Sequence, residues 1–284
     1  MIDVTGIVPS HNSERTIRQC LRSLESNKVR EIIVVDGGSI DRTLALASRF
    51  PLVRIIPQTR PLGRARELGW TEAKSEFVLF LDADAYLQHD NDVELLLQHM
   101  SSPEVAGVSC RVACANPERI LPRLRDIDFQ LVHPTDFKRT EVLDCIANPA
   151  LCGLFRRDLL MTIQGTSWLD FDYAEDLYVL NKLRSMGYRI LTVYNPPAFH
   201  YHREDLRGVF SQFYCQGFGR RALVNDIGEG FYRHRNAAEV VRRLSNVHSS
   251  WSDRLAYPIY RITTETAFLL GYGLEASRRL SRVV

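Results

Sequence analysis

The segment Phe77-Val-Leu-Phe-Leu81 is entirely apolar and runs directly into two carboxylates, Asp82 and Asp84. An apolar run of this length is typical of a strand that is covered on both faces. The two aspartates would then lie at the carboxyl end of that strand, where open α/β sheets bind their ligands. Alternate residues of an extended segment share a face, so both carboxylates can reach one cation. The segment therefore predicts a buried strand that carries a site for a hard cation such as Mg²⁺.

The same Asp-x-Asp pattern occurs four times, and only its position separates the first pair from the others. The remaining three lie on polar or helix-like stretches, where solvated surface acids are the ordinary interpretation. The first pair alone follows an apolar strand. The four pairs are Asp82/Asp84, Asp90/Asp92, Asp126/Asp128 and Asp170/Asp172.

Strand-like and helix-like segments alternate up to residue 112. Ile17, Cys20, Leu21 and Leu24, for example, recur at helical spacing after the first strand. This alternation predicts an α/β fold with a Rossmann-like, mostly parallel central sheet flanked by helices. The strands that we expect in this part are Val4–Val8, Glu31–Val35, Val53–Ile56, Phe77–Leu81 and Val105–Val112.

The second half of the chain is less regular and then becomes helical. Glu175 and Asp176 open an expected helix, and a strand over Tyr188–Val193 should be broken by Asn195-Pro-Pro197. The last residues have the pattern of amphipathic helices. We therefore predict a nucleotide-binding and catalytic domain over residues 1–202 and a helical C-terminal extension over residues 203–284.

Composition indicates an ordinary globular protein. The chain has 284 residues, of which 45% are hydrophobic and 25% charged. Its amino terminus lacks the basic and apolar regions of a signal peptide, and no segment approaches the ~20 apolar residues of a spanning helix. Six cysteines without a CxxC pair favour thiols in a reducing compartment over a zinc site. The expected location is the cytoplasm.

Charge is unevenly distributed along the chain. The net charge is only +2, yet the residues from Arg203 onward contain 13 Arg, no Lys and 8 acidic residues, which gives +5. Arginine is favoured where proteins bind phosphates. The C-terminal region is therefore either a solvated basic surface or a surface for an anionic partner.

Eight short segments together point to a known family. In chain order they are Ile7–Asn12, Ile32–Asp41, Gly63–Arg66, Phe80–Asp84, Gly153–Arg157, Tyr173–Asp176, Gly187–Ile190 and Tyr201–His202. Their order and spacing resemble the inverting glycosyltransferase family 2, which has the GT-A fold, from Val4 to about His202. The resemblance implies an enzyme that uses a nucleotide-sugar as its donor.

The resemblance assigns the first two loops to the nucleotide. Pro9, His11 and Glu14 match the first nucleotide-contacting loop, and Asp36 matches the acid that binds the base of the donor. Gly38 would allow close approach of the ligand. The alternative for Asp36 is a structural role in the turn Asp-Gly-Gly-Ser.

An arginine near a predicted helix start is the expected partner of the diphosphate. Arg64 lies where amide dipoles and a guanidinium could both face the phosphates. For the neighbouring Arg66, a solvated position on the helix is an equally good interpretation.

The metal site follows from the same resemblance. Asp82 would contact the ribose and help to hold a Mg²⁺ or Mn²⁺ ion, and Asp84 would bind that ion. The ion would neutralise charge on the departing nucleoside diphosphate. His202 matches the late histidine of the family and could complete the metal shell. His200, two residues earlier, is the less favoured ligand, and a structural role remains open for both.

Asp176 is the expected general base. Inverting transfer needs one carboxylate to take the proton of the acceptor hydroxyl, and a helix N-terminus favours negative charge there. Asp176 fits the family better than Glu175, Asp170 and Asp172. The competing interpretation treats Glu175 and Asp176 as ordinary acids at a helix start.

These residues predict a metal-dependent inverting transferase that moves a sugar from a UDP-, GDP- or dTDP-sugar to an acceptor. A saccharide or a polyprenyl-phosphate lipid could be that acceptor, since the Arg-rich region could rest on a membrane surface. Gln216-Gly-Phe-Gly-Arg-Arg221 lacks the Gln-x-x-Arg-Trp signature of the processive members, which disfavours polymer synthesis coupled to export.

Two other classes of function remain. A sugar-phosphate nucleotidyltransferase would carry a glycine-rich loop after its first strand, but Val8–Glu14 contains no glycine. A non-catalytic protein that binds sugars or a membrane surface would bind a donor without turning it over.

Overall fold

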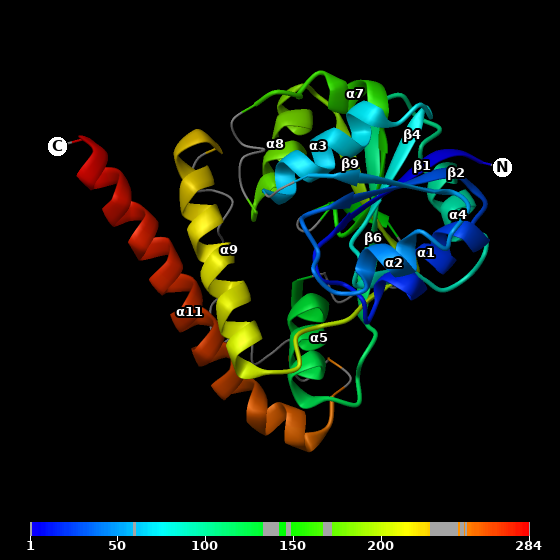
Figure 1. Ribbon diagram of the computed structural model, residues 1–284. Helices are drawn as coiled ribbons and strands as arrows, with labels where there is room; N and C mark the ends of the chain where they lie inside the picture. The colour runs from blue at the N-terminus through cyan, green and yellow to red at the C-terminus, as the bar shows by residue number, and fades with distance from the viewer. Residues whose placement is uncertain are drawn as a thin grey trace. The chain divides into compact units, whose positions relative to one another are not determined.

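The computed structural model describes residues 2–58, 61–132, 142–145, 149–166, 172–227, 244, 247 and 249–283 (Figure 1). The chain forms two compact units. The first comprises Met1–Val112 and Thr140–His200, and the second comprises Ala113–Arg139 and Tyr201–Val284. The division after His200 lies close to the predicted boundary. The second unit also includes residues 113–139, which we expected in the first domain.

A nine-stranded sheet forms the centre of the first unit. Its strands follow the order β3-β2-β1-β4-β8-β6-β9-β5, and β7 pairs with β9. The strands are β1 (Ile2–Ser10), β2 (Val29–Asp36), β3 (Val53–Pro57), β4 (Phe77–Leu81), β5 (Ala85–Leu87), β6 (Val105–Cys114), β7 (Val142–Asp144), β8 (Cys152–Arg156) and β9 (Arg189–His200).

The sheet contains both parallel and antiparallel pairs of strands. β1 pairs in parallel with β2 and β4, and β2 pairs in parallel with β3. The pairs β4–β8, β6–β8, β5–β9 and β7–β9 are antiparallel. The predicted α/β class with helices around a central sheet is confirmed, although these four pairings are antiparallel.

Helices cover both faces of this sheet, because each buries one apolar stripe. In α1 the buried residues Ile17, Cys20, Leu21 and Leu24 have the helical spacing seen in the sequence. α1 packs against α2, whereas α3 packs against α7 and α8 (Figure 1). These helices are α1 (Ile17–Ser26), α2 (Thr43–Ala47), α3 (Leu62–Glu72), α4 (Asp92–Gln98), α7 (Arg157–Met161) and α8 (Glu175–Ser185).

The expected break in the late strand was wrong. β9 continues through Pro196 and Pro197 to His200, and the bond between Asn195 and Pro196 is cis. β9 pairs with β7 through residues 191–193 and with β5 through residues 198–200. Both prolines lie between these two sets of paired residues, so neither has to donate a hydrogen bond to β7 or β5. This extension carries His200 to the edge of the sheet.

The second unit is helical, as predicted for the C-terminal region. α5 (Ile120–Val132), α9 (Leu206–Ile227) and α11 (Trp251–Val283) pack together, with α9 and α11 side by side (Figure 1). None of the described helices has the length and hydropathy that a membrane span requires. The core of this unit contains Leu124, Ile127, Leu131, Val209, Phe213, Val247, Tyr257, Tyr260 and Ala267.

Candidate active site

The carboxyl end of β4 carries the two predicted aspartates. The Asp82 amide donates to the Leu151 carbonyl at 3.0 Å, and the Ala85 amide donates back to the Asp82 carbonyl at 2.8 Å. This turn leads directly into β5, in which Ala85 lies opposite His200 of β9. The pairing of β5 with β9 therefore brings a histidine from a distant part of the chain to the two aspartates.

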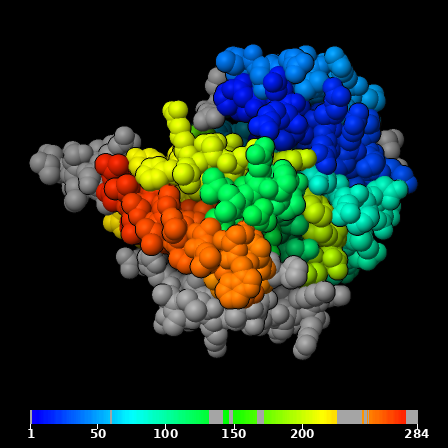
Figure 2. Space-filling model, turned by 90° about the horizontal axis from the view of Figure 1, so that it is seen from below, coloured from blue at the N-terminus to red at the C-terminus, as the bar shows by residue number. Residues whose placement is uncertain are grey.

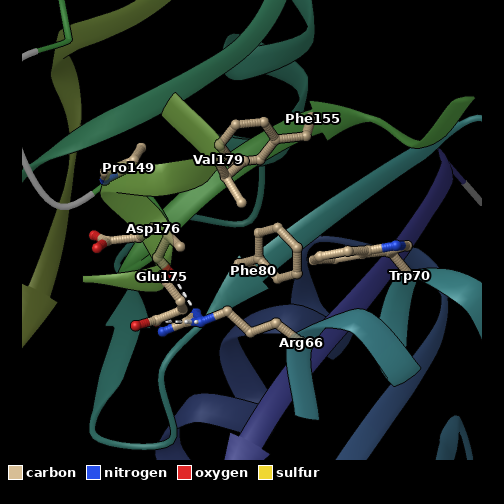
Figure 3. Close-up of a pocket in the computed structure, with 9 residues that line it drawn as sticks. Arg66, Trp70, Phe80, Pro149, Phe155, Glu175, Asp176 and Val179 are labelled. Atoms are coloured by element: carbon tan, nitrogen blue, oxygen red, sulfur yellow. Dashed lines mark hydrogen bonds and ion pairs between the residues drawn. The ribbon is translucent and has the colours of Figure 1, made fainter. Parts of the chain in front are cut away.

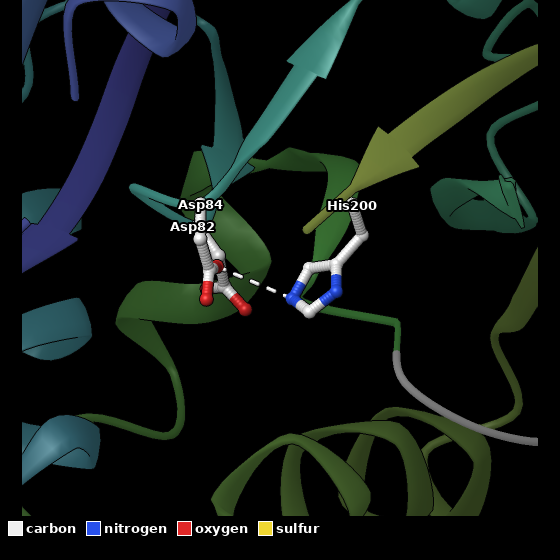
Figure 4. A group of neighbouring side chains, drawn as sticks. All are labelled: Asp82, Asp84 and His200. Carbon is white, nitrogen blue, oxygen red and sulfur yellow. Dashed lines mark ion pairs between the residues drawn. The ribbon is translucent and has the colours of Figure 1, made fainter. Parts of the chain in front are cut away.

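Asp82, Asp84 and His200 form a cluster that could hold a metal ion. One ligand atom from each lies within 4.8 Å of the others, and the side chains point toward one another (Figure 4). His200 Nε2 is 3.2 Å from Asp84 Oδ1. Two carboxylates and one imidazole suit Mg²⁺ or Mn²⁺, with Mn²⁺ the better match for the nitrogen.

The structure groups His200 with the aspartates, whereas the sequence favoured His202. An extended backbone would have placed both rings on one face, but β9 ends at His200. The His202 amide instead donates to Asn116 Oδ1 at 3.0 Å, and the His202 ring stacks on Phe129 at 5.5 Å. His202 lies beyond the end of β9 and belongs to the second unit, so the alternation of side chains along β9 does not extend to it.

A buried arginine connects the metal cluster to α8. Arg66 donates from Nη2 to Asp82 Oδ1 at 2.9 Å and from Nε to Glu175 Oε1 at 3.2 Å. Its Nη1 donates to the Ala150 carbonyl at 2.8 Å, and its guanidinium lies 5.7 Å from the centre of the Phe80 ring. Figure 3 shows Arg66 reaching from α3 toward Glu175. A single cation thus fixes three separate segments around the site.

Sequence reasoning did not select Arg66. We expected Arg64 to face the diphosphate, and it donates to Glu67 Oε2 at 2.5 Å on the same helix. The signal for Arg66 was its spacing, because it lies three and four residues before Gly69 and Trp70, which are both buried. Arg66 therefore belongs to the inward face of α3.

The carboxylates of the site influence one another. Burial raises the pKa of Asp82 to about 6; Arg66 opposes this shift, whereas the charges of Asp84 and Asp176 add to it. Burial also raises the pKa of Glu175 to about 8, again against the effect of Arg66. Asp176 is therefore close enough to Asp82 to act on it electrostatically.

Asp176 lies in the first turn of α8 and lines a pocket. Ala174, just before the helix, has a left-handed φ of +73°. Asp176 Oδ1 accepts a hydrogen bond from the Leu177 amide at 2.9 Å. The carboxylates of Glu175 and Asp176 diverge, so that Glu175 meets Arg66 and Asp176 points away from it (Figure 3). The pocket is lined by Arg66, Trp70, Phe80, Pro149, Ala150, Phe155, Glu175, Asp176 and Val179.

The carboxylate of Asp36 organises the loop after β2. Its Oδ1 accepts hydrogen bonds from Ser10 Oγ at 3.1 Å and Ser39 Oγ at 2.5 Å. Its Oδ2 accepts from the amides of Gly38 at 3.0 Å and Ser39 at 2.8 Å. Gly38 has a φ of +84°, and a Cβ there would meet no atom within 4 Å. Asp36 thus has the turn role that the sequence left open, while its contact with a donor base stays a prediction.

The other predicted nucleotide contacts gather at the same edge of the sheet. Pro9 is buried in β1, and His11 Nδ1 lies 3.0 Å from the Gly37 carbonyl. Glu14 Oε2 accepts hydrogen bonds from the amide and Nε of Arg42, each at 3.1 Å. These contacts hold the loop after β1 against the loop after β2, at the carboxyl ends of two parallel strands.

Comparison with known proteins gives a family match. The model of the family described as "Glycosyl transferase family 2" matches residues 5–163. The chain is 25% identical over 235 residues to poly-beta-1,6-N-acetyl-D-glucosamine synthase of Staphylococcus aureus (strain COL), covering 78% of this chain and 56% of that protein. The same enzyme of Staphylococcus epidermidis is 24% identical. The chain thus spans about half the length of these relatives.

Solved structures share the fold at low sequence identity. A mannosyltransferase from Pyrobaculum calidifontis in complex with GDP-Man and Mn²⁺ has a TM-score of 0.61 and 20% identity, with 99% of this chain and 81% of that chain covered. Glucosyl-3-phosphoglycerate synthase from Mycobacterium tuberculosis, in complex with Mn²⁺, UDP and glucosyl-3-phosphoglycerate, has a TM-score of 0.55 and 19% identity, with 79% of this chain and 80% of that chain covered. S. aureus TarS 1–349 has a TM-score of 0.54 and 17% identity, with 99% of this chain and 92% of that chain covered.

Proposed function

The chain belongs to glycosyltransferase family 2 and has the GT-A fold, and we propose that it is a metal-dependent inverting transferase that uses a nucleoside-diphosphate sugar. The observation that carries this proposal is the cluster of Asp82, Asp84 and His200 at the carboxyl end of β4, within electrostatic range of Asp176. Ligands of open α/β sheets bind at this edge.

The donor would bind between the two loops and the metal cluster. Asp82, Asp84 and His200 would hold a Mg²⁺ or Mn²⁺ ion, which when bound supplies positive charge against the diphosphate leaving group. Asp82 would also contact the ribose, and the loops that carry His11, Glu14 and Gly38 would enclose the nucleotide, with Asp36 facing its base. Arg64, near the start of α3, would face the diphosphate. Arg66 keeps Asp82 in place through the hydrogen bond that its Nη2 donates to Asp82 Oδ1.

Asp176 would act as the general base. It accepts the proton of the acceptor hydroxyl while that oxygen forms a bond to the anomeric carbon and the bond from this carbon to the diphosphate oxygen breaks. Attack opposite the leaving group inverts the configuration. The amide dipoles at the start of α8 favour negative charge on Asp176 before the transfer. Glu175 is held by Arg66 and is therefore the weaker candidate.

The donor is a UDP-, GDP- or dTDP-sugar, and the acceptor a saccharide or a polyprenyl-phosphate lipid. Complexes of GDP-Man and of UDP with Mn²⁺ among the structural neighbours support this class of donor for the present chain. A lipid acceptor would suit the basic C-terminal region, in which Arg203, Arg207, Arg220 and Arg221 are candidates for its phosphate. The enzyme would then work at the cytoplasmic face of a membrane.

Polymer synthesis is a second candidate, because the named relatives are synthases of a polysaccharide. The chain lacks a Gln-x-x-Arg-Trp signature at Gln216–Arg221, which favours a single transfer. Mass spectrometry of products formed with excess donor separates the two, since a polymerase gives a ladder of products and a single transferase gives one.

Replacing Asp176 by Asn tests the proposed function. The variant should bind UDP, GDP or dTDP with Mn²⁺ as the wild type does, while transfer falls by about 10²–10⁴-fold. Asp158→Asn is a matched control, because Asp158 also lies in the first turn of a helix and accepts a hydrogen bond from the next amide at 2.8 Å. Full turnover by Asp176→Asn would remove the base from the mechanism. Release of pyrophosphate from a nucleoside triphosphate would instead favour a nucleotidyltransferase.

A further inference from the structure

One face of α11 is apolar and open to solvent. Its exposed large side chains have between 48% and 80% of their surface accessible. Figure 2 shows the first part of this helix, in orange, uncovered beside α5 in green. The exposed apolar residues of α11 are Trp251, Leu255, Ile259, Ile262, Leu269, Leu270 and Leu274.

This face carries no charge between residues 251 and 275, the part of α11 whose side chains the structure describes. The other exposed residues there are Ser252, Pro258, Thr266 and Gly273. The stretch from Trp251 to Leu274 extends over about 35 Å of helix. An uncharged apolar surface of this length is unusual for a side of a protein that meets only water.

The acidic groups of α11 are turned away from this face or paired. Asp253 and Glu275 are buried, and Asp253 forms an ion pair with Arg123 at 3.0 Å. Glu265 forms an ion pair with Arg261. Arg254 and Arg261 are seven residues apart, so they lie on one flank of the helix. In sequence the helix continues with Arg278, Arg279 and Arg282.

We propose that this uncharged face of α11 is the surface through which the protein lies on an anionic lipid bilayer. Apolar side chains would enter the boundary between headgroups and acyl chains, while Arg254 on the flank would meet lipid phosphates. Arg261 is already paired with Asp128 and Glu265. Trp251, at the start of the helix, is the residue type that membrane interfaces favour. The inference rests on the proposed function in one respect, because a lipid-linked acceptor gives the contact its purpose.

The breadth of the face favours a bilayer over a second copy of the chain. A seam between two helices uses two positions in each heptad. In α11, exposed residues also occur in adjacent pairs, as at Leu269 with Leu270 and at Gly273 with Leu274. Such pairs widen the face beyond a seam, and a planar lipid surface can cover all of it.

Binding of the full-length chain to vesicles tests the proposal. The wild type should co-sediment with equimolar phosphatidylcholine and phosphatidylglycerol vesicles at low salt, and much less with phosphatidylcholine alone. The double variant Ile259→Glu with Ile262→Glu should bind vesicles at least about tenfold more weakly, since it places two charges on the face that would enter the bilayer. Ile40→Glu is the matched control, because Ile40 is 92% exposed in the first unit.

Tryptophan fluorescence gives a second readout. Vesicles should shift the emission to shorter wavelength in the wild type, and Trp251→Phe should remove that shift. Equal vesicle binding by the double variant and the wild type would overturn the proposal, as would an absence of wild-type binding. A wild-type dimer that the double variant converts to a monomer, with vesicles binding neither protein, would assign the face to a second copy.

The lipid proposal and the enzymatic proposal fail separately. The double variant should keep its transfer to a water-soluble acceptor, whereas Asp176→Asn should keep its vesicle binding. Loss of both properties in the double variant, with unfolding excluded by circular dichroism, would show that α11 serves the transfer itself and would overturn a role confined to docking.

Discussion

His200 is the residue that the structure places beside Asp82 and Asp84, and its replacement gives a direct test of the proposed metal cluster. His200→Ala removes the only nitrogen ligand of the group formed with Asp82 and Asp84. Affinity for Mn²⁺ in the presence of a nucleoside diphosphate should therefore fall by at least about tenfold, as measured by calorimetric titration.

His202→Ala is the matched control for that titration. It removes the ring that stacks on Phe129, so it should lower stability and leave the metal affinity of the folded protein within about twofold. Retained affinity in His200→Ala together with a loss in His202→Ala would restore the assignment favoured by the sequence.

Glu175 should make the stability of the protein depend on pH. Its pKa is raised from 4.5 to about 8 in the folded chain, mainly by burial. The folded state then holds one more proton than the unfolded state between these two values, so the free energy of unfolding should fall as pH rises through this window. The slope approaches about −1.4 kcal/mol per pH unit.

Denaturant unfolding at several pH values measures that slope. Glu175→Gln cannot titrate, so the difference between its slope and that of the wild type isolates Glu175 from Asp82, whose pKa is also raised. Parallel curves for the two proteins would show that Glu175 is ionised throughout, with Arg66 outweighing burial.

Single residues of the site could be predicted where position along the chain carries the information. Asp82 and Asp84 stand at the end of an apolar strand, and that pattern is local. The buried pair of Arg66 and Glu175 depends on α3 and α8 meeting in space, and an arginine with two acidic partners looks in sequence like a solvated one. His200 could not be chosen over His202 without knowing where β9 ends.

Among the helices, the contact between α9 and α11 requires two glycines. A Cβ on Gly271 would lie 2.0 Å from the Tyr214 carbonyl oxygen, and one on Gly217 would lie 2.0 Å from the Phe268 carbonyl oxygen. Backbone atoms cannot yield as a flexible side chain can, so Gly271→Ala should force the helices apart and destabilise the fold by about 1–3 kcal/mol.

Gly273 supplies the control for this substitution, because a Cβ there would meet nothing within 4 Å. Gly273→Ala should be neutral or stabilise the helix by up to about 1 kcal/mol. Thermal unfolding of the two variants measures the difference. Similar melting temperatures for both would show that the two helices approach less closely than their glycines allow.

The elements with local patterns were predictable, and those set by pairing were not. β4 has the predicted bounds, and α1 buries the residues whose helical spacing the sequence shows. The prolines of β9 indicated a break, since proline cannot donate a ladder hydrogen bond. That prediction was wrong because the prolines fall between two sets of paired residues, which sequence alone cannot show. β8 is the antiparallel partner of both β4 and β6 and follows each of them after a long interval in the chain. An alternation of strands and helices does not indicate the direction in which such a late strand pairs.

For the whole molecule, the division into two units does not follow the order of the chain. Residues 113–139 belong to the second unit, to which they contribute α5, although the residues before and after them belong to the first. Leu124, Ile127 and Leu131 of α5 are almost completely buried in a core that also contains Phe213 and Tyr257. The sequence showed an irregular middle segment but not its partner, because a helix with one apolar stripe can pack against any other.

A chain that ends at residue 202 should therefore not behave as an independent domain. It would keep α5 but lose α9 and α11, and so expose three apolar side chains that are 1–2% accessible in the full chain. Exposure of such a patch should produce aggregation on size-exclusion chromatography and binding of a hydrophobic dye.

A second truncated chain locates the cause of that aggregation. It also ends at residue 202 and so lacks α9 and α11. In addition, a Gly/Ser linker replaces residues 113–139, which removes α5 as well. If orphaned α5 is the defect, this chain should be monomeric, unfold cooperatively and bind Mn²⁺ with nucleotide, because Asp82, Asp84 and His200 all lie in the first unit. A monomeric, cooperative chain 1–202 that retains α5 would contradict this account, since burial by α9 and α11 would then be dispensable for the stability of the first unit.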